Sequence, residues 1–159
     1  MLGIVLAIGS LFVLGVSPTT ESQAFPTIQE QNAEPVMYND YTLQIPSIGL
    51  TTQMEKIVRQ GTSLPVPDNN PGYYSANNYN LFIVGHNHTI FKRLNEKPKA
   101  IIIWQNGEQK TYNLVAYENK PKEQISMERL LDFHGIVIMT CSGEYIDGGF
   151  THRLLLYYQ

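Results

Sequence analysis

Between Tyr41 and the C-terminus, the apolar residues of this sequence fall into short runs. Each run is rich in Val, Ile, Leu or aromatic residues, and turn-forming residues such as Gly, Pro and Asn stand between the runs. Short apolar runs bounded by turn signals indicate strands. The clearest of them are Leu81–Val84, Ala100–Trp104, Ile136–Met139 and Leu154–Tyr158.

Turn and helix signals complete the expected fold. Asn106-Gly107 predicts a two-residue hairpin loop, and Gln60–Asn80, which is rich in Pro, Gly and Asn, predicts a long loop. One amphipathic helix is expected over Ser126–Phe133, capped by Ser126, and a shorter helical turn over Thr89–Leu94. The pattern as a whole predicts a mostly β fold, a closed or nearly closed β-barrel of about seven or eight strands with one or two short helices.

The first 24 residues predict a signal peptide or a membrane anchor. Leu2–Val16 is an uncharged apolar run, shorter than the roughly 20 residues that a spanning helix usually needs, and Ser22-Gln23-Ala24 fits a cleavage site of small residues. The tract Ser17–Asn39 is rich in Ser, Thr, Pro, Glu, Gln and Asn and poor in large apolar residues, so a polar linker is expected at residues 25–40. The folded domain is therefore expected at residues 41–159, secreted or held at the extracellular face of the cell membrane.

The charge of the chain argues against one class of partner. The formal net charge is −3 and the pI is near 5.8. A nucleic-acid-binding domain usually carries a basic stripe or patch, and the sequence has none. We therefore expect no nucleic-acid partner.

Cys141 is the only cysteine, so it cannot form a disulfide within the chain. Such a cysteine is a reactive thiol, an intermolecular partner or a small buried side chain. If Ile136–Thr140 pairs with Leu154–Tyr158 in an antiparallel ladder, Cys141 ends one strand and Arg153 begins the other, about 4.5–5.5 Å apart. The segment between them, Ser142–His152, is expected to be a flexible glycine-bearing loop, too long for a tight turn, that forms a wall of a binding cleft.

A cysteine nucleophile needs a partner that handles protons, usually a histidine. His86 follows the run Leu81–Val84 and Gly85, so it occupies the end of a strand as Cys141 does. If these two buried strands run parallel, both residues lie on the same rim of the barrel. The other three histidines have less suitable positions: in a loop, at a helix end, or next to Arg153 on the opposite face (His88, His134 and His152).

These residues together resemble the sortase transpeptidases. The resemblance rests on Val84-Gly85-His86, on the sequence VIMTC at Val137–Cys141, and on Arg153 ahead of an apolar strand. The segment LQIPSIGL at Leu43–Leu50 is similar to the strand-turn-strand opening of that catalytic domain. Val137 departs from the family pattern Thr-Leu-x-Thr-Cys, which has threonine there. The resemblance covers Tyr41–Gln159 and implies a sortase-type β-barrel.

The resemblance also implies a reaction. Cys141 is expected to attack the Thr–Gly amide of a sorting signal of the Leu-Pro-x-Thr-Gly type and to form a thioacyl-enzyme. His86 is expected to exchange protons with the leaving and incoming amines. Arg153 is expected to bind the substrate backbone and the oxyanion, with the backbone N–H of Ser142 as a second donor. Thr140 either lines the site or supports the strand end.

The same resemblance implies the partners. The substrates are expected to be sorting-signal peptides of secreted surface proteins, the acceptor an amine of a cell-wall precursor or of a pilin, and the N-terminal segment the link to the membrane. No cofactor or metal is expected, because the acidic residues are too scattered to indicate a calcium site.

Other functions remain open from the residues alone. His86-x-His88 with Cys141 or His152 has the donor types of a zinc site, although no acidic residue is positioned to orient the ligands. A Cys/His hydrolase or an L,D-transpeptidase uses similar groups, but the Ser-x-Gly-Cys pattern of the latter is absent, since Thr140 precedes Cys141. An exported binding module would instead keep Cys141 buried and inert, which a thiol reagent would reveal.

Overall fold

The computed structural model describes residues 41–61 and 64–159. The predicted signal peptide or anchor and the predicted linker lie outside these residues. No helix in the described part of the chain is long and apolar enough to span a membrane.

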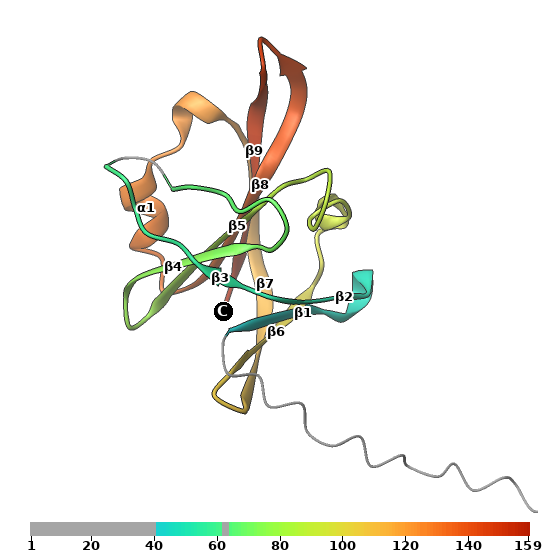
Figure 1. Cartoon of the computed structure of the whole chain (residues 1–159), viewed down its shortest axis with the longest axis vertical. Helices are drawn as coiled ribbons and strands as arrows, with labels where there is room; N and C mark the ends of the chain where they lie inside the picture. The colour runs from blue at the N-terminus through green and yellow to red at the C-terminus, as the bar shows by residue number, and fades with distance from the viewer. Residues whose placement is uncertain (1–40, 62–63) are drawn as a thin grey trace, which may run out of the picture. The chain divides into compact units, whose positions relative to one another are not determined.

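The described residues form one nine-stranded sheet in the order β2-β1-β6-β7-β9-β8-β5-β4-β3 (Figure 1). The strands are β1 (Thr42–Ile45), β2 (Leu50–Gln53), β3 (Glu55–Lys56), β4 (Gly72–Asn77), β5 (Asn80–Gly85), β6 (Ala100–Gln105), β7 (Glu108–Pro121), β8 (Gly135–Ile146) and β9 (Gly149–Tyr158). The helices are short: η1 (Pro46–Ile48), η2 (Leu94–Glu96), η3 (Lys122–Gln124) and α1 (Met127–Leu131).

The two edge strands of this sheet, β2 and β3, follow each other in the chain with only Met54 between them. At this junction the Met54 N–H donates to the carbonyl oxygen of Tyr41, 2.8 Å away. One continuous segment therefore pairs with β1 on one side and with β4 on the other. The sheet is nearly closed into a barrel, as the sequence predicts. The sheet has nine strands when this continuous segment is counted as two strands, β2 and β3.

All residues of strand β5 are buried. This explains why the apolar run Leu81–Val84 is continuous and does not alternate with polar residues. Leu81 and Ile83 pack in the core cluster that includes Leu43, Ile101 and Tyr158. Phe82 and Val84 alternate with them and belong to a second cluster with Val137, Leu155 and two residues of α1, Leu130 and Leu131. A strand covered on both faces needs apolar side chains at every position.

The structure refines the predicted helices. Ser126 caps α1 by accepting a hydrogen bond from the Arg129 N–H, but the helix is shorter than predicted and ends at Leu131. The expected helical turn at Thr89–Leu94 is a series of turns that leads into η2.

The long loop predicted over Gln60–Asn80 is wrong in its second half. Strand β4 occupies Gly72–Asn77 and pairs antiparallel with β5, so that Tyr73 lies opposite Ile83. Asn77 and Asn80 face each other across the turn, and the register shifts between Tyr74 and Asn77. Tyr73 and Tyr74 supply the strand preference that the nearby Pro and Asn residues obscured.

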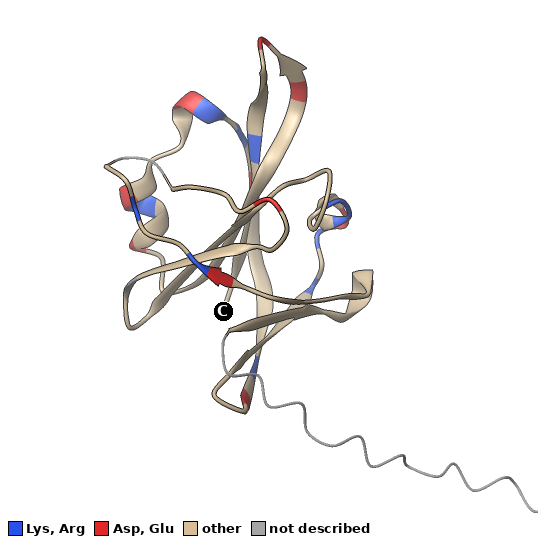
Figure 2. Cartoon of the chain, viewed as in Figure 1, with Lys and Arg blue, Asp and Glu red and all other residues tan. Residues whose placement is uncertain are grey.

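Charged side chains are dispersed over the described elements, with Lys and Arg close to Asp and Glu in most places (Figure 2). One such group lies between α1 and β7, where Arg129 Nη2 and Lys120 Nζ each lie 3.0 Å from the carboxylate of Glu118. The same carboxylate accepts a hydrogen bond from the Tyr157 hydroxyl, 3.1 Å away. These contacts connect α1 to the outside of the barrel.

Two buried tyrosines at the end of β9 make the fold sensitive to alkaline pH. Burial and the neighbouring Glu118 raise the pKa of Tyr157 to about 12, and burial also raises the pKa of Tyr158. In the unfolded chain the pKa of both hydroxyls is about 10. Between about pH 10 and about pH 12, the folded state therefore holds these protons more tightly than the unfolded state.

We expect the free energy of unfolding to fall as the pH rises from about 10 to about 12, by up to about 1.4 kcal/mol per pH unit for each tyrosine. Below about pH 10 both tyrosines are protonated in the folded and in the unfolded state, so they cause no pH dependence of the free energy of unfolding. Urea denaturation at a series of pH values measures the slope. Tyr157→Phe removes one titrating group and flattens the slope, and an unchanged slope in this variant would contradict the expectation.

Candidate active site

The ends of β5 and β8 bring His86 and Cys141 to the same rim of the barrel. The two strands are parallel neighbours, and Gly85 pairs with Thr140. His86 and Cys141 are the next residues on the two chains. The predicted parallel arrangement is therefore confirmed, and it places the imidazole-bearing and thiol-bearing residues side by side.

Arg153 lies on the other side of Cys141. Strands β8 and β9 are antiparallel, and Cys141 pairs with Arg153. The register predicted from the sequence is therefore confirmed. Because β8 lies between β5 and β9 in the sheet, the thiol-bearing strand has the histidine on one side and the arginine on the other.

Cys141 and His86 are both partly exposed. Cys141 is a free cysteine and is only partly buried, and the side chain of His86 keeps 29% of its surface exposed. A cysteine that only fills the core is usually fully buried. This exposure argues against an inert packing role for Cys141.

The guanidinium of Arg153 is held by backbone carbonyl groups. Its Nη1 donates to the carbonyl oxygens of His152 at 2.8 Å and Phe150 at 3.1 Å. Among residues 41–61 and 64–159, no carboxylate forms an ion pair with it. This cation is fixed in place and not neutralised, and the residue that bears it pairs with Cys141. A cation in such a position favours negative charge on a nearby sulfur or oxyanion.

Gly85 and Phe91 fix the position of His86. The Phe91 N–H donates to the carbonyl oxygen of His86 at 3.1 Å, and Phe91 is almost completely buried. A Cβ atom on Gly85 would lie 2.7 Å from the Phe91 ring, so only glycine fits before the histidine. Two titratable side chains lie near the imidazole: Asp68, with Oδ1 4.0 Å from Nε2, and His88, whose ring centre is 5.2 Å away.

Thr140 and Ser142, predicted to contact substrate, both make hydrogen bonds within the chain. The hydroxyl of Thr140 is buried and donates to the carbonyl oxygen of Gly85 at 2.8 Å, which ties β8 to β5 at the rim. The hydroxyl of Ser142 donates to Asn119 Oδ1 on β7 at 2.7 Å. This geometry favours the strand-support role for Thr140, and a substrate-binding role for either residue stays a prediction.

Replacing Thr140 with valine tests this support role. Because the change removes a buried hydroxyl donor and leaves the side-chain shape nearly unchanged, we expect the free energy of unfolding to fall by about 1–3 kcal/mol. Urea denaturation measures the change, and Thr111→Val at an exposed position of β7 is the matched control, expected to stay within about 0.5 kcal/mol. Equal stability of the two variants would contradict the role.

The predicted loop Ser142–His152 is wrong. Strands β8 and β9 continue beyond the barrel rim as a hairpin that turns at Asp147 and Gly148 (Figure 1). Both turn residues have positive φ, 50° and 78°, which a two-residue hairpin loop with Asp-Gly requires. A register shift between Ser142 and Tyr145 includes Gly143, also at positive φ. The wall beside the thiol is a two-stranded ribbon.

The structure gives no support to the zinc alternative. No group of three His, Cys, Asp or Glu side chains within the described ranges could hold a metal ion. His134 lies at the other end of β8, one residue before Gly135, and its ring stacks on Tyr79. His152 pairs across β8 with Ser142, and its Nδ1 lies 2.8 Å from the hydroxyl of Thr151.

Comparison with known protein families distinguishes between the functions that the residues alone leave open. The sequence model of the Sortase domain matches residues 43–159, which includes every residue of the rim described above. The chain belongs to the sortase family. Among curated proteins, no significant match to the sequence was found.

Solved sortase structures share the fold. The chain is similar to a lid mutant of sortase A from Corynebacterium diphtheriae, with 21% identity, a TM-score of 0.58, and coverage of 76% of this chain and 69% of that chain. For sortase C1 of Streptococcus agalactiae the identity is 18%, the TM-score 0.53 and the coverage 75% and 65%. For sortase C1 of Streptococcus suis the identity is 16%, the TM-score is 0.59, and the match covers 76% of this chain and 73% of that chain. The chain thus spans about two thirds of the length of the first two structures.

Sortase membership and the barrel fold together indicate a cysteine transpeptidase. Cys141 is the one cysteine of this sequence and is therefore the candidate for the thiol of that reaction. The family assignment therefore agrees with the geometry of the rim, where the same cysteine lies between a histidine and an arginine.

Proposed function

We propose that this sortase cleaves a sorting signal of the Leu-Pro-x-Thr-Gly type between Thr and Gly and transfers the acyl group to an amine. The observation that carries the proposal is the position of Cys141 between His86 and Arg153 on one rim. Nucleophile, proton carrier and oxyanion-stabilising cation are the three groups that acyl transfer through a thioester needs.

In the first step the sulfur of Cys141 attacks the carbonyl carbon of the threonine. The bond between this carbon and the glycine nitrogen breaks, and His86 gives a proton to the departing amine. A thioester between Cys141 and the threonine remains. Arg153 stabilises the negative charge that forms on the carbonyl oxygen, and the backbone N–H of Ser142 is a proposed second donor.

In the second step an amine resolves the thioester. The nitrogen of the acceptor attacks the same carbonyl carbon and passes a proton to His86, and the bond from carbon to sulfur breaks to restore the thiolate. A new amide forms, and the overall reaction consumes no oxidant, reductant or metal. The acceptor we propose is an amine of a cell-wall precursor or of a pilin lysine.

The proposed location follows from the substrates. Sorting signals belong to secreted surface proteins, so the catalytic domain works outside the cytoplasm. We propose that residues 1–24 direct it there, as a signal peptide or as an anchor in the cell membrane, and that the polar residues 25–40 are a linker to the domain.

The guanidinium of Arg153 is expected to be sensitive to a conservative change. Lysine keeps the charge but has no planar fork, so it cannot hold the two backbone carbonyls and an oxyanion together. We expect Arg153→Lys to lower kcat/KM by about 10²-fold, as loss of an oxyanion donor does. Arg129→Lys on the surface of α1 is the matched control and is expected to retain activity, and equal activity of both variants would contradict the role of Arg153.

The experiment that tests the function uses the full-length chain, a library of Leu-Pro-x-Thr-Gly peptides and an excess of an amine, with products identified by mass spectrometry. A transfer product supports the proposal. Release of the free acid without aminolysis would favour the Cys/His hydrolase instead. Absence of cleavage together with an unreactive Cys141 would favour the binding module.

A further inference from the structure

A cavity in the described part of the chain lies at the opposite end of the barrel from Cys141. Its volume is about 940 Å³, and its lining includes Asn80 and Leu81 at the start of β5 and Gly135 and Ile136 at the start of β8. Cys141 is further along β8 by about 20 Å of strand. The cavity is therefore separate from the catalytic rim.

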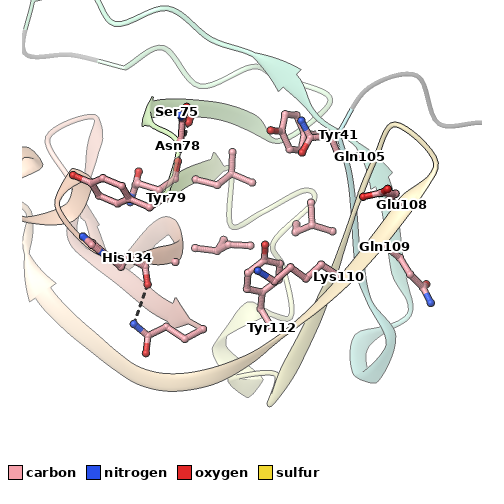
Figure 3. A pocket seen from close by; sticks show the side chains of 16 residues that line it. Tyr41, Ser75, Asn78, Tyr79, Gln105, Glu108, Gln109, Lys110, Tyr112 and His134 are labelled. Atoms are coloured by element: carbon pink, nitrogen blue, oxygen red, sulfur yellow. Dashed lines mark hydrogen bonds between the residues drawn. The ribbon is translucent and has the colours of Figure 1, made fainter.

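The floor of the cavity is apolar and its walls are aromatic. Leu81, Ile103 and Ile136 form the floor and belong to the barrel core. Three tyrosines form the walls: Tyr79 lies on one side together with His134, while Tyr41 and Tyr112 lie towards the other side (Figure 3). The cavity therefore offers apolar and aromatic surface together with many polar groups.

The polar groups of the lining are mostly neutral hydrogen-bonding groups. They are amides and hydroxyls, which both donate and accept. Those named in Figure 3 are Ser75, Asn78, Gln105 and Gln109. The charged members are one carboxylate, Glu108, and one ammonium, Lys110, whose Nζ lies 4.9 Å from the centre of the Tyr112 ring. The charges balance, so the lining offers no excess cation for an anionic ligand.

One detail of this lining favours a ligand. The Tyr79 ring packs against His134, with ring centres 4.0 Å apart and planes tilted by 35°. Tyr79 still keeps 49% of its surface exposed, so an aromatic surface is held in place and open to solvent.

We propose that this cavity binds a neutral saccharide. A sugar ring has one face of C–H groups, which complements the negative face of an aromatic ring, and a rim of hydroxyl groups, which both donate and accept hydrogen bonds as the surrounding amides do. An open cavity of this volume accommodates a short oligosaccharide. This binding site is independent of the proposed transfer reaction.

The test uses the full-length chain in a sugar-free detergent, with two probes: the tetrasaccharide of N-acetylglucosamine and maltotetraose. Titration calorimetry and saturation-transfer NMR measure binding. We expect saturable binding of at least one probe with a dissociation constant below about 1 mM. Tyr79→Ala removes an exposed aromatic surface and is expected to weaken this binding about tenfold or more.

Tyr117→Ala is the matched control, because Tyr117 is 52% exposed on β7 and does not line the cavity. It is expected to change the dissociation constant by less than about twofold. Gln105→Ala, also at an exposed position, is a second cavity variant and is expected to weaken binding too. Absence of saturable binding to both probes, or equal effects of Tyr79→Ala and Tyr117→Ala, would overturn the proposal.

Discussion

Replacing Cys141 with alanine is expected to lower the rate of peptide transfer by at least about 10³-fold. The reaction through a thioester has no other nucleophile, since the sequence contains no second cysteine, and loss of a catalytic nucleophile removes most of an enzyme's rate enhancement. The fold is expected to remain intact, because the side chain is partly exposed and alanine is smaller. Product formation is measured by mass spectrometry under single-turnover and steady-state conditions.

Cys141→Ser is the conservative companion. It keeps the size of the side chain, but a hydroxyl is a much weaker nucleophile than a thiolate at neutral pH, so we expect it to be nearly as inactive as the alanine variant. The folded state of both variants is checked by near-UV circular dichroism. Transfer at the rate of the unmodified chain in either variant would show that the thiol does not form the intermediate.

Replacing His86 with alanine is the change with the next largest expected effect. The imidazole handles a proton in both halves of the reaction, so its loss raises two barriers, and we expect the rate to fall by about 10²–10⁴-fold. Added imidazole is expected to restore part of the activity, because the space left by the side chain is open to solvent. The partial rescue distinguishes loss of a proton carrier from damage to the rim.

His88 provides the matched control for His86. It lies two residues further along the same segment, with its ring centre 5.2 Å from that of His86, and it is exposed. We expect His88→Ala to reduce the rate by less than about threefold. If His88→Ala were as inactive as His86→Ala, the assignment of the proton carrier would be wrong.

The sequence predicts that His86, Cys141 and Arg153 lie at one rim if β5 pairs parallel with β8 and β8 pairs antiparallel with β9, and the structure has both pairings. The runs at β5 and β8 are continuously apolar, as strands covered on both faces are. Parallel pairing of two such strands brings His86 and Cys141 together at their ends. The position of Arg153 followed in the same way from an antiparallel pair with a regular register. All three placements depend on simple strand geometry.

The predictions that were wrong concern turns and irregular strands. Asp147-Gly148 is a strong signal for a two-residue hairpin loop, but the glycines around it suggested a flexible loop, and the ribbon was missed. The strand β4 was missed because prolines and asparagines surround Tyr73 and Tyr74. In both cases pairing with a neighbouring strand outweighs the local preference of the flanking residues.

The role of Thr140 and the second cavity needed the three-dimensional structure. A buried hydroxyl group can line a site or bond to a backbone carbonyl, and only the 2.8 Å contact to Gly85 favours the second. The cavity is lined by residues from distant parts of the chain, such as Tyr41, Tyr79 and Tyr112. No local sequence pattern connects them, so the aromatic lining could not be recognised in advance.

The most direct test of the transpeptidase mechanism is the intact mass of the full-length chain after incubation with a Leu-Pro-x-Thr-Gly peptide in the absence of an added amine. We expect a mass increase equal to the peptide up to its threonine, located on Cys141 by peptide mapping and lost when an amine is added. We expect no increase for Cys141→Ala. An adduct on another residue, or cleavage that persists in Cys141→Ala, would contradict the thioacyl-enzyme and the role of Cys141.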